Sequence, residues 1–379
     1  MRIAALAAIA LGAPFALAGC GSDSKSSGTT TGASAHKEVA VKITDAGCEP
    51  AKLTLAAGPT TFMVENDGAT KVTEYEILDG ATILGEVENI APGLSGKFSL
   101  TLKPGTYTTY CPGGTTSERG SLEVTGAGAV AASAEATAAV AAYRKFVEAQ
   151  TKLLVAETTK FANAVKAGNV AKAKRLYPVA RKPYERIEPV AESFGDLDPA
   201  IDAREGDVDP QDWTGFHPLE KALWKTGSLK DAGPLADQLV QDVQLLDSRV
   251  GAMSLEAAQI ANGSVELLGE VSKSKITGEE ERYSHIDLVD VEANVAGAKA
   301  GFDAVRPIVE KKNAKLAETL DARFAAMTTA LDKYRDAGDP SGYVPYTALT
   351  PAQTRELSRS VDALAEPLSQ VGAIVVASG

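Results

Sequence analysis

The sequence is poor in the side chains that bind transition metals most often. Its 379 residues include three histidines, His36, His217 and His285, and three cysteines, Cys20, Cys48 and Cys111. It has no His-Glu-x-x-His motif, which excludes the zincin arrangement of a metallopeptidase. A single histidine among carboxylates is also a poor match to peptidase zinc sites, which usually contain more imidazole.

Positive charge is also in short supply. The formal net charge is −12, which argues against a basic surface for nucleic acid. Beyond the first twenty residues, no run is long and apolar enough to cross a membrane. An acidic surface outside the membrane is compatible with a protein that handles cations.

Residues 1–20 are typical of a bacterial lipoprotein signal peptide. Ile3 to Leu17 is apolar but too short to span a bilayer comfortably. The lipobox pattern Leu17-Ala18-Gly19-Cys20 then predicts that Cys20 becomes the lipidated N-terminus; an ordinary secretory signal with an incidental cysteine is the alternative. Residues 21–37, rich in Ser, Thr and Gly, predict a flexible tether. We therefore expect an exported, periplasmic or cell-surface protein that is lipid-anchored to the membrane.

Residues 38–125 are predicted to form a β domain. Apolar and polar residues alternate at 39–43, 52–55 and 60–64. Turn signals rich in Gly, Pro, Asn and Asp follow at 57–59, 66–68, 79–80, 91–93 and 103–105. Short strands at this spacing are typical of a β-sandwich or barrel.

The order of these strands and turns, ending in Pro104-Gly105-Thr-Tyr-Thr-Thr-Tyr-Cys111-Pro, resembles a cupredoxin. In that family a cysteine just after this strand binds copper. A blue-copper site also takes two histidines, and residues 38–125 contain none, which excludes an ordinary blue-copper centre. Glu74 and Glu76 leave the same face of one strand because side chains repeat every two residues. The candidate copper or iron ligands are Cys48, Cys111, Glu74, Glu76 and Met63; alternatively, the cysteines form a disulfide and the glutamates are solvated.

After a Gly/Ala-rich hinge at 124–129 the sequence changes character. From about residue 130 it is rich in Ala, Leu and Val at helical spacing, and Phe146, Leu153, Phe161 and Val165 are predicted to share one stripe of a long helix. Further helices are predicted at 169–193, 216–226, 233–252, 255–274, 284–311, 314–335 and 351–371. Residues 130–379 are thus predicted to form one helical bundle or a pair of bundles, which makes the chain a multidomain β + α protein.

The stretch Trp213-Thr-Gly-Phe-His217-Pro-Leu-Glu220-Lys-Ala-Leu-Trp224 carries the strongest candidate metal ligands. If it is helical, His217 and Glu220 lie on one face, within reach of a single ion. A long acidic connection, 195–215, leads into it. Imidazole with several carboxylates suits iron, manganese or zinc. Alternatively, His217 caps a helix end and Glu220 faces solvent.

Three further acid-rich segments supply possible co-ligands. They contain Glu185 and Glu188, then Asp198, Asp202 and Glu205, then Glu279, Glu280, Glu281, His285 and Asp287. Each has a structural alternative. Glu185 and Glu188 could equally be solvated side chains that form ion pairs with Arg181 or Arg186. The second set could be solvated residues of a loop. Residues 279–281 could mark the start of a helix, since acidic residues favour helix N-termini.

Four separated motifs resemble the imelysin family, and in particular its EfeO-type iron-uptake lipoproteins, which also carry a cupredoxin-like domain ahead of the imelysin domain. They are Ala180-Arg-Lys-Pro-Tyr-Glu-Arg-Ile-Glu-Pro189, Asp196-Leu-Asp-Pro-Ala-Ile-Asp-Ala-Arg-Glu205, Thr214-Gly-Phe-His-Pro-Leu-Glu-Lys-Ala-Leu223 and Ser274-Lys-Ile-Thr-Gly-Glu-Glu-Glu-Arg-Tyr-Ser-His-Ile-Asp-Leu288. The resemblance implies a metal site with His217 and Glu220, and with Glu185, Glu188 and Asp202 as co-ligands. Glu280, Arg282 and Asp287 are weaker candidates for the opposite wall. In the β domain the resemblance implies a second site at Glu74, Glu76, Cys48 and Cys111.

The resemblance also implies ferric or ferrous iron as the bound metal, with copper as a further candidate in the cupredoxin-like domain. It implies a membrane iron permease and a haem peroxidase-like protein as partners in an EfeUOB-type uptake system. We therefore expect an extracytoplasmic protein that captures iron and passes it to the permease. The alternatives are an imelysin-type metallopeptidase, which would need an open metal position and a general base, and a protein that binds acidic polysaccharide through a metal.

Overall fold

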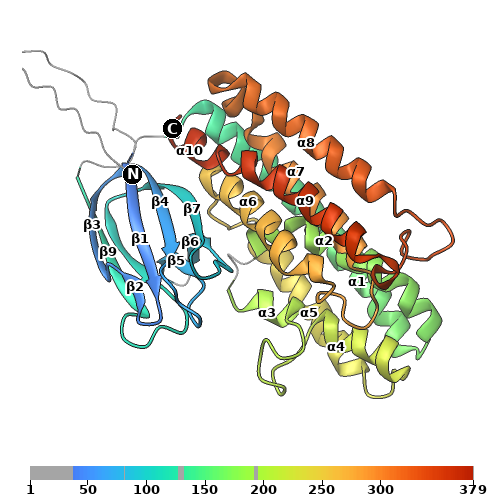
Figure 1. The fold of residues 1–379 in the computed structure, drawn as a ribbon. Helices are drawn as coiled ribbons and strands as arrows, with labels where there is room; N and C mark the ends of the chain where they lie inside the picture. Colours follow the sequence, from blue (N-terminus) through green and yellow to red (C-terminus); the bar gives the residue numbers. More distant parts are fainter. Residues whose placement is uncertain (1–36, 81, 127–131, 192–194, 379) are drawn as a thin grey trace, which may run out of the picture. The chain divides into compact units, whose positions relative to one another are not determined.

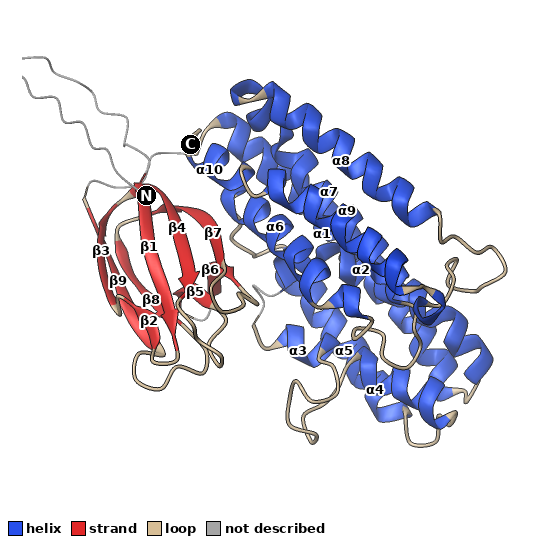
Figure 2. Ribbon diagram, in the orientation of Figure 1, coloured by secondary structure: helices blue, strands red, loops and turns tan. Residues whose placement is uncertain are grey.

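The computed structural model describes residues 37–80, 82–126, 132–191 and 195–378, which all lie in one compact unit. Strands occupy residues 37–126 and helices residues 132–378, and we call these the strand part and the helical part (Figures 1 and 2). The predicted signal peptide, Cys20 and His36 lie outside the described residues, as does the tether except Lys37. No helix of the described ranges has the length and apolar character that a membrane span requires.

The strand part consists of two sheets over one core. Its strands are β1 (Lys37–Thr44), β2 (Gly47–Glu49), β3 (Lys52–Ala56), β4 (Gly58–Asn66), β5 (Tyr75–Asp79), β6 (Thr82–Val87), β7 (Ser95–Leu102), β8 (Gly105–Tyr110) and β9 (Arg119–Thr125). The sheet orders are β2-β1-β4-β7 and β3-β9-β8-β5-β6. Alternate residues of both sheets, such as Val41, Phe62, Ile77 and Leu122, point into the shared core. The predicted cupredoxin-like β-sandwich is confirmed.

The predicted turn at 57–59 is shorter than expected. β3 ends at Ala56 and β4 begins at Gly58, so a single residue separates them. The two strands belong to different sheets: β3 pairs with β9, whereas β4 pairs with β1 and β7. The chain therefore changes sheet at Ala57 instead of forming a hairpin. Gly58, with φ +123°, supplies the backbone conformation that this change requires.

The helical part begins with α1 (Ala134–Lys166) and α2 (Val170–Ala191). It continues with α3 (Leu197–Asp202), α4 (Phe216–Lys221), the π-helix η2 (Ala222–Thr226), α5 (Gly233–Val250), α6 (Ala257–Lys273) and the 3-10 helix η3 (Lys275–Thr277). It ends with α7 (Asp287–Lys312), α8 (Ala314–Asp332), the 3-10 helix η4 (Tyr346–Ala348), α9 (Pro351–Leu368) and α10 (Val371–Val376). Buried apolar side chains from these helices form one continuous cluster.

Two sequence predictions for this part need correction. Leu153 does not lie on the buried stripe of α1, because it is 46% exposed while Leu154 is fully buried. The buried positions of α1 include Tyr143, Val147, Leu154 and Phe161, whose spacings of four, seven and seven residues return to one helix face. The connection 195–215 is also not a plain loop, since it contains α3.

Close packing of α2 against α7 brings polar side chains of the two helices together in the interior of the helical part. A Cβ atom at Gly297 of α7 would lie 2.3 Å from the carbonyl oxygen of Arg186 on α2, so only glycine fits there. This approach lets polar side chains of α7 reach α2. The amide of Asn294, for example, donates to the Glu185 carbonyl oxygen at 3.0 Å.

The strand part contacts the helical part through α6 and α10. Asn262 exchanges two hydrogen bonds with the backbone of Ser99, at 2.7 and 3.3 Å. The backbone N–H of Glu88 donates to Glu266 at 3.0 Å, and Lys273 Nζ donates to the Glu88 carbonyl oxygen at 3.0 Å. These bonds hold the edge of β6 and β7 against α6.

Candidate metal centre

His217 reaches its position through a tight approach of two short helices. Gly215, just before α4, has φ +89°, and a Cβ there would lie 2.1 Å from the carbonyl oxygen of Ile201 on α3. Only glycine allows this contact. The approach brings the end of α3 against the start of α4, and His217 Nε2 lies 3.4 Å from Asp202 Oδ1.

Glu280 completes the group from a third segment. It lies on the turn between η3 and α7, and its Oε1 is 3.6 Å from His217 Nε2. One ligand atom from each of Asp202, His217 and Glu280 lies within 4.8 Å of the others. His217 is only 2% exposed, and within the described residues its Nε2 makes no hydrogen bond. We call these three residues the helical cluster.

Glu220 faces the other ring nitrogen of His217. Its Oε2 is 3.2 Å from Nδ1, and its Oε1 accepts the backbone N–H groups of Tyr283 and Ser284, both at 2.7 Å. His217 and Glu220 are close together, as the spacing predicts, and they meet through Nδ1, whereas Asp202 and Glu280 face Nε2. Glu220 fixes the ring so that Nε2 points at the other two carboxylates, which is how the partners of metal-binding histidines usually act.

The charges of the helical cluster depend on one another. Burial alone would lower the pKa of His217, but Asp202, Glu220 and Glu280 outweigh it and hold the pKa well above its ordinary value. Burial would raise the pKa of Glu280, yet the charges of Lys275 and His217 hold it well below its ordinary value. His217 is therefore an imidazolium at neutral pH when no cation is bound. A metal ion that binds Nε2 must displace that proton.

Glu185 and Glu188, predicted as co-ligands, are already paired with protein cations. Lys275 Nζ lies 3.1 Å from Glu185 Oε2 and 2.5 Å from Glu188 Oε1. Asn294 donates to the same two carboxylates at 2.9 and 2.6 Å. The pairing of Glu185 with Arg181, which the sequence offered as an alternative, is present, but it is buried and not solvated.

Arg181 occupies the centre of the carboxylate group and was not expected there. It is fully buried and bonds both Glu185 and Asp202. Its Nε is 2.7 Å from Glu281 Oε1 and 3.4 Å from Asp290 Oδ2. A buried guanidinium requires such partners, since an unpaired charge in the interior costs several kcal/mol. The spacing of four residues between Arg181 and Glu185 on one helix was the available signal.

The remaining predicted residues of the opposite wall lie outside the helical cluster. Asp287 Oδ1 accepts the backbone N–H of Glu281 at 3.1 Å and thereby holds the turn that carries Glu280. Arg282 donates to the Glu205 carbonyl oxygen at 2.9 Å, which ties the same turn to the loop after α3. These two residues therefore shape the turn that positions Glu280.

A second carboxylate group lies on the strand part. Glu76 of β5 stands directly opposite Glu86 of β6 in the strand register, and Glu74 precedes Glu76 by two residues. One oxygen from each of the three carboxylates lies within 4.8 Å of the others, and we call them the strand cluster. Burial and the neighbouring Glu76 raise the pKa of Glu74 to about 9, and burial raises the pKa of Glu76 to about 7. The alternation Gly85-Glu86-Val87-Glu88 was the sequence signal for the third member.

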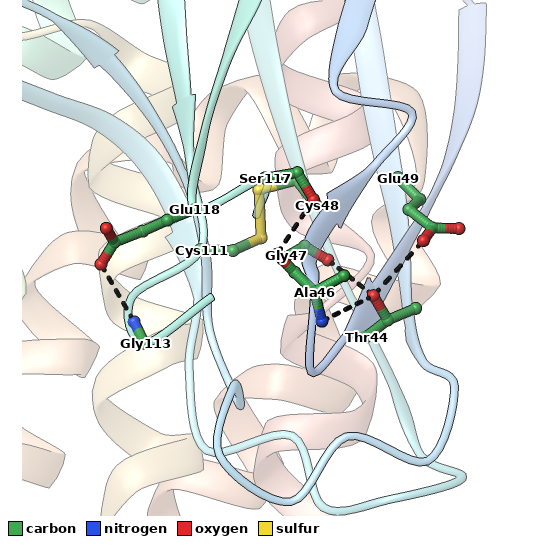
Figure 3. Close-up of a disulfide and its surroundings, with 9 residues drawn as sticks. All are labelled: Thr44, Ala46, Gly47, Cys48, Glu49, Cys111, Gly113, Ser117 and Glu118. Carbon is green, nitrogen blue, oxygen red and sulfur yellow. Dashed lines mark hydrogen bonds between the residues drawn. A yellow bond between two sulfur atoms is a disulfide. The ribbon is translucent and has the colours of Figure 1, made fainter. Parts of the chain in front are cut away.

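The cysteines predicted as ligands are joined to each other. Cys48 and Cys111 form a disulfide, as Figure 3 shows, and the backbone N–H of Cys48 donates to the Ser117 carbonyl oxygen at 3.0 Å. In this form neither sulfur is a thiolate, so the copper-ligand alternative for the pair does not hold here. Met63, a further candidate, lies on β4 of the other sheet.

Comparison with known proteins agrees with both parts of the chain. The imelysin family model matches residues 139–371, and a cupredoxin-like domain model matches residues 7–124. The iron uptake system component EfeO of Escherichia coli O157:H7 is 43% identical over 348 residues, which cover 89% of this chain and 91% of that protein. The proteins of the same name from Escherichia coli K12 and Shigella flexneri are 42% identical over the same shares.

A solved structure also shares the helical fold. It is a Parabacteroides distasonis protein named as an iron-regulated protein A precursor, with a TM-score of 0.51 and 16% identity. The likeness covers 64% of this chain and 96% of that one, and at this identity it concerns the fold alone. The matches over both parts and the identity to EfeO place the present chain in the imelysin family, among the EfeO iron uptake system components.

Proposed function

We propose that this protein binds an iron ion at the helical cluster and supplies it to an uptake system. The observation that carries the proposal is the placement of His217. Its Nε2 is buried without a hydrogen bond, 3.4 and 3.6 Å from carboxylate oxygens that come from two other segments of the chain. In the metal-free protein the proton on this nitrogen faces both carboxylates, and a cation that replaces the proton would be bound by the imidazole and by both carboxylates.

The donors fit iron. Imidazole with carboxylates suits iron, manganese and zinc, and two carboxylates favour the higher charge of the ferric ion. Arg181 and Lys275 contribute fixed positive charge, since they contact Asp202 and Glu280 from the side. The incoming ion replaces the proton on His217, so binding adds less net charge to the interior than the ion carries.

The strand cluster is proposed as a second iron position. A carboxylate-only donor set favours hard cations, whereas copper centres use thiolate and imidazole. Residues 38–125 contain no histidine, and the two cysteines of this region form the disulfide. The residues present therefore do not fit a copper cofactor, and no step of the proposed function involves copper.

The location and partners of the protein are part of the same proposal. The lipobox ending at Cys20 supports export and a lipid anchor on the outer side of the membrane. The name of the relatives, iron uptake system component, supports a role within such a system, and we propose as its partners the membrane permease and the haem peroxidase-like protein that the EfeUOB-type resemblance implies.

The test is iron titration of the metal-free protein with matched histidine variants. His217→Asn removes the proposed ligand. Substituting a residue that only hydrogen-bonds to a metal ligand typically weakens binding by about 10–100-fold, so we expect loss of the ligand itself to lower the affinity for ferric iron by more than about 100-fold. His285→Asn is the control, because His285 lies outside the cluster and asparagine tolerates its φ of +59°. Equal iron binding by wild type and His217→Asn would remove the site from the proposal. Peptide hydrolysis by the metal-loaded wild type, lost in His217→Asn, would favour a metallopeptidase instead.

A further inference from the structure

The strand cluster and the helical cluster open into one cleft. This cleft has a volume of about 880 Å³ and is lined by residues of both parts of the compact unit. Glu74, Glu76 and Glu86 line it from the strand part, and Asp202 and Glu280 line it from the helical part. Both proposed iron positions therefore face the same space.

The wall between the clusters is also acidic. Glu88, two residues beyond Glu86, lines the cleft between the two clusters. Glu270 of α6 lines it as well. These two carboxyl groups add to those of the strand cluster and the helical cluster on the same wall. A cation that moves along the cleft would thus find carboxylate oxygens at every stage between the two clusters.

The cleft carries little compensating charge of its own. Of the described residues that line it, ten are acidic and one, Arg204, is basic. A cleft lined by one sign of charge raises the local concentration of the opposite ion. Arg204 lies at the helical end, where its Nη1 is 3.4 Å from Glu280 Oε2 and its Nε is 3.0 Å from Asp207 Oδ2.

His217 provides an observation independent of the acidic wall. It is 2% exposed, its Nε2 has no hydrogen-bond partner among the described residues, and this atom faces Asp202 and Glu280. Behind Asp202 and Glu280, which line the cleft, there is thus a buried imidazole nitrogen, which a purely solvated acidic surface would not have.

We propose that the cleft is an internal passage, through which an iron ion captured at the strand cluster moves to the helical cluster within one molecule. The ion exchanges carboxylate ligands along the wall and ends on His217, beside Oε1 of Glu280, while Arg204 contacts Oε2 of the same carboxylate. The inference rests on the proposed function, since it requires iron to bind at His217.

The two tryptophans of the chain allow arrival at the helical cluster to be measured. Trp213 lies on the loop before α4 and Trp224 lies in η2, so both are in the helical part near His217. We would mix metal-free full-length protein with less than one equivalent of ferric iron, kept in solution by a weak chelator. In a stopped-flow instrument, quenching of tryptophan fluorescence then reports the arrival of iron at the helical cluster.

Two variants interrupt the passage. Glu74→Gln/Glu76→Gln/Glu86→Gln removes the strand cluster, and Glu88→Lys places a cation in the cleft while both clusters stay intact. We expect each to slow the quench about ten-fold or more, at the lower limit of electrostatic steering by a charged cleft, while the quench at saturating iron is kept. The control Glu49→Gln/Glu65→Gln/Glu123→Gln makes the same three Glu-to-Gln replacements at exposed positions of the strand part.

The outcomes separate the two proposals. Unchanged rates in both passage variants would mean that iron reaches His217 directly from solvent, and equal slowing in the control would mean general attraction by net charge; either result overturns the passage. A wild-type quench that is absent, or that persists in His217→Asn, contradicts the proposed function itself and the passage with it. A slow quench in the passage variants alone, lost in His217→Asn, supports both.

Discussion

The contacts of Glu220 predict a defined effect of the substitution Glu220→Gln. In the wild type, Oε1 accepts two backbone N–H groups and Oε2 faces Nδ1 of His217. In the variant, the amide oxygen takes over the two backbone donors. The amide NH₂ group then points at Nδ1, where the carboxylate had accepted a proton.

This exchange reverses the tautomer of the ring. An NH₂ donor requires Nδ1 to accept, which moves the proton of the neutral ring to Nε2, the atom proposed to bind iron. Iron binding would then leave two donors facing each other at Nδ1. Loss of such a partner typically weakens metal binding by about 10–100-fold, which corresponds to about 1.4–2.7 kcal/mol. A hydrogen bond to a charged group is worth about 1.5–3 kcal/mol, so two independent routes give the same magnitude.

The assay is competitive titration of ferric iron against a chelator of known affinity, with wild type, Glu220→Gln and His217→Asn side by side. Thermal unfolding of each variant checks that the fold is kept. We expect Glu220→Gln to bind iron at an affinity between the other two proteins. Wild-type affinity in Glu220→Gln would refute the orienting role. A loss as complete as in His217→Asn would show instead that Glu220 is a ligand, as the sequence suggested.

Three further predictions concern charge, protons and the disulfide. Lys275→Met leaves the buried Glu188 without a counter-ion and Glu185 with Arg181 alone, and should lower the free energy of unfolding by roughly 3–5 kcal/mol, measured by denaturant titration. Lys315→Met at an exposed position should change it by less than about 0.5 kcal/mol. Because the pKa of His217 is raised well above its ordinary value, iron must displace a proton at neutral pH; the affinity should rise about ten-fold per pH unit from pH 6 to 8, and a flat profile would contradict a protonated ring. Cys48→Ser/Cys111→Ser opens a loop with a sequence separation of 63 residues and should destabilise the strand part by about 4 kcal/mol, visible as lower resistance to denaturant, while ferric affinity at the helical cluster stays unchanged.

The elements of the helical part could be predicted because residues typical of helix ends mark them, such as Gly233, Pro234 and Gly251 for α5 and the N-cap Asn313 for α8. The predicted helix at 233–252 is observed as Gly233–Val250, and the one at 314–335 as Ala314–Asp332. The buried stripe of α1 was placed less well, since Leu153 and Leu154 are chemically identical and only the packing of α1 decides which is buried. Local periodicity predicts that a helix forms, but it does not decide which of two neighbouring apolar residues faces the core.

The candidate site was predictable in its ligand types but not in its pairings. The spacing of His217 and Glu220 places both side chains on one helix face, yet it cannot show that they meet through Nδ1. Lys275 is a lysine three residues before a glycine, and nothing local marks it as buried. Glu86 joins the strand cluster only through the register of β5 and β6. These pairings depend on contacts between distant segments, which no single stretch of sequence contains.

The fixed cations at Arg181 and Lys275 have a consequence for the protein in the absence of its cargo. Many small metalloproteins unfold when the metal is withdrawn, because only the metal neutralises their ligands. Here two side chains of the chain itself balance much of the buried negative charge. The folded state therefore does not depend on bound metal, so a component of an iron uptake system can keep its binding residues in place while iron is scarce.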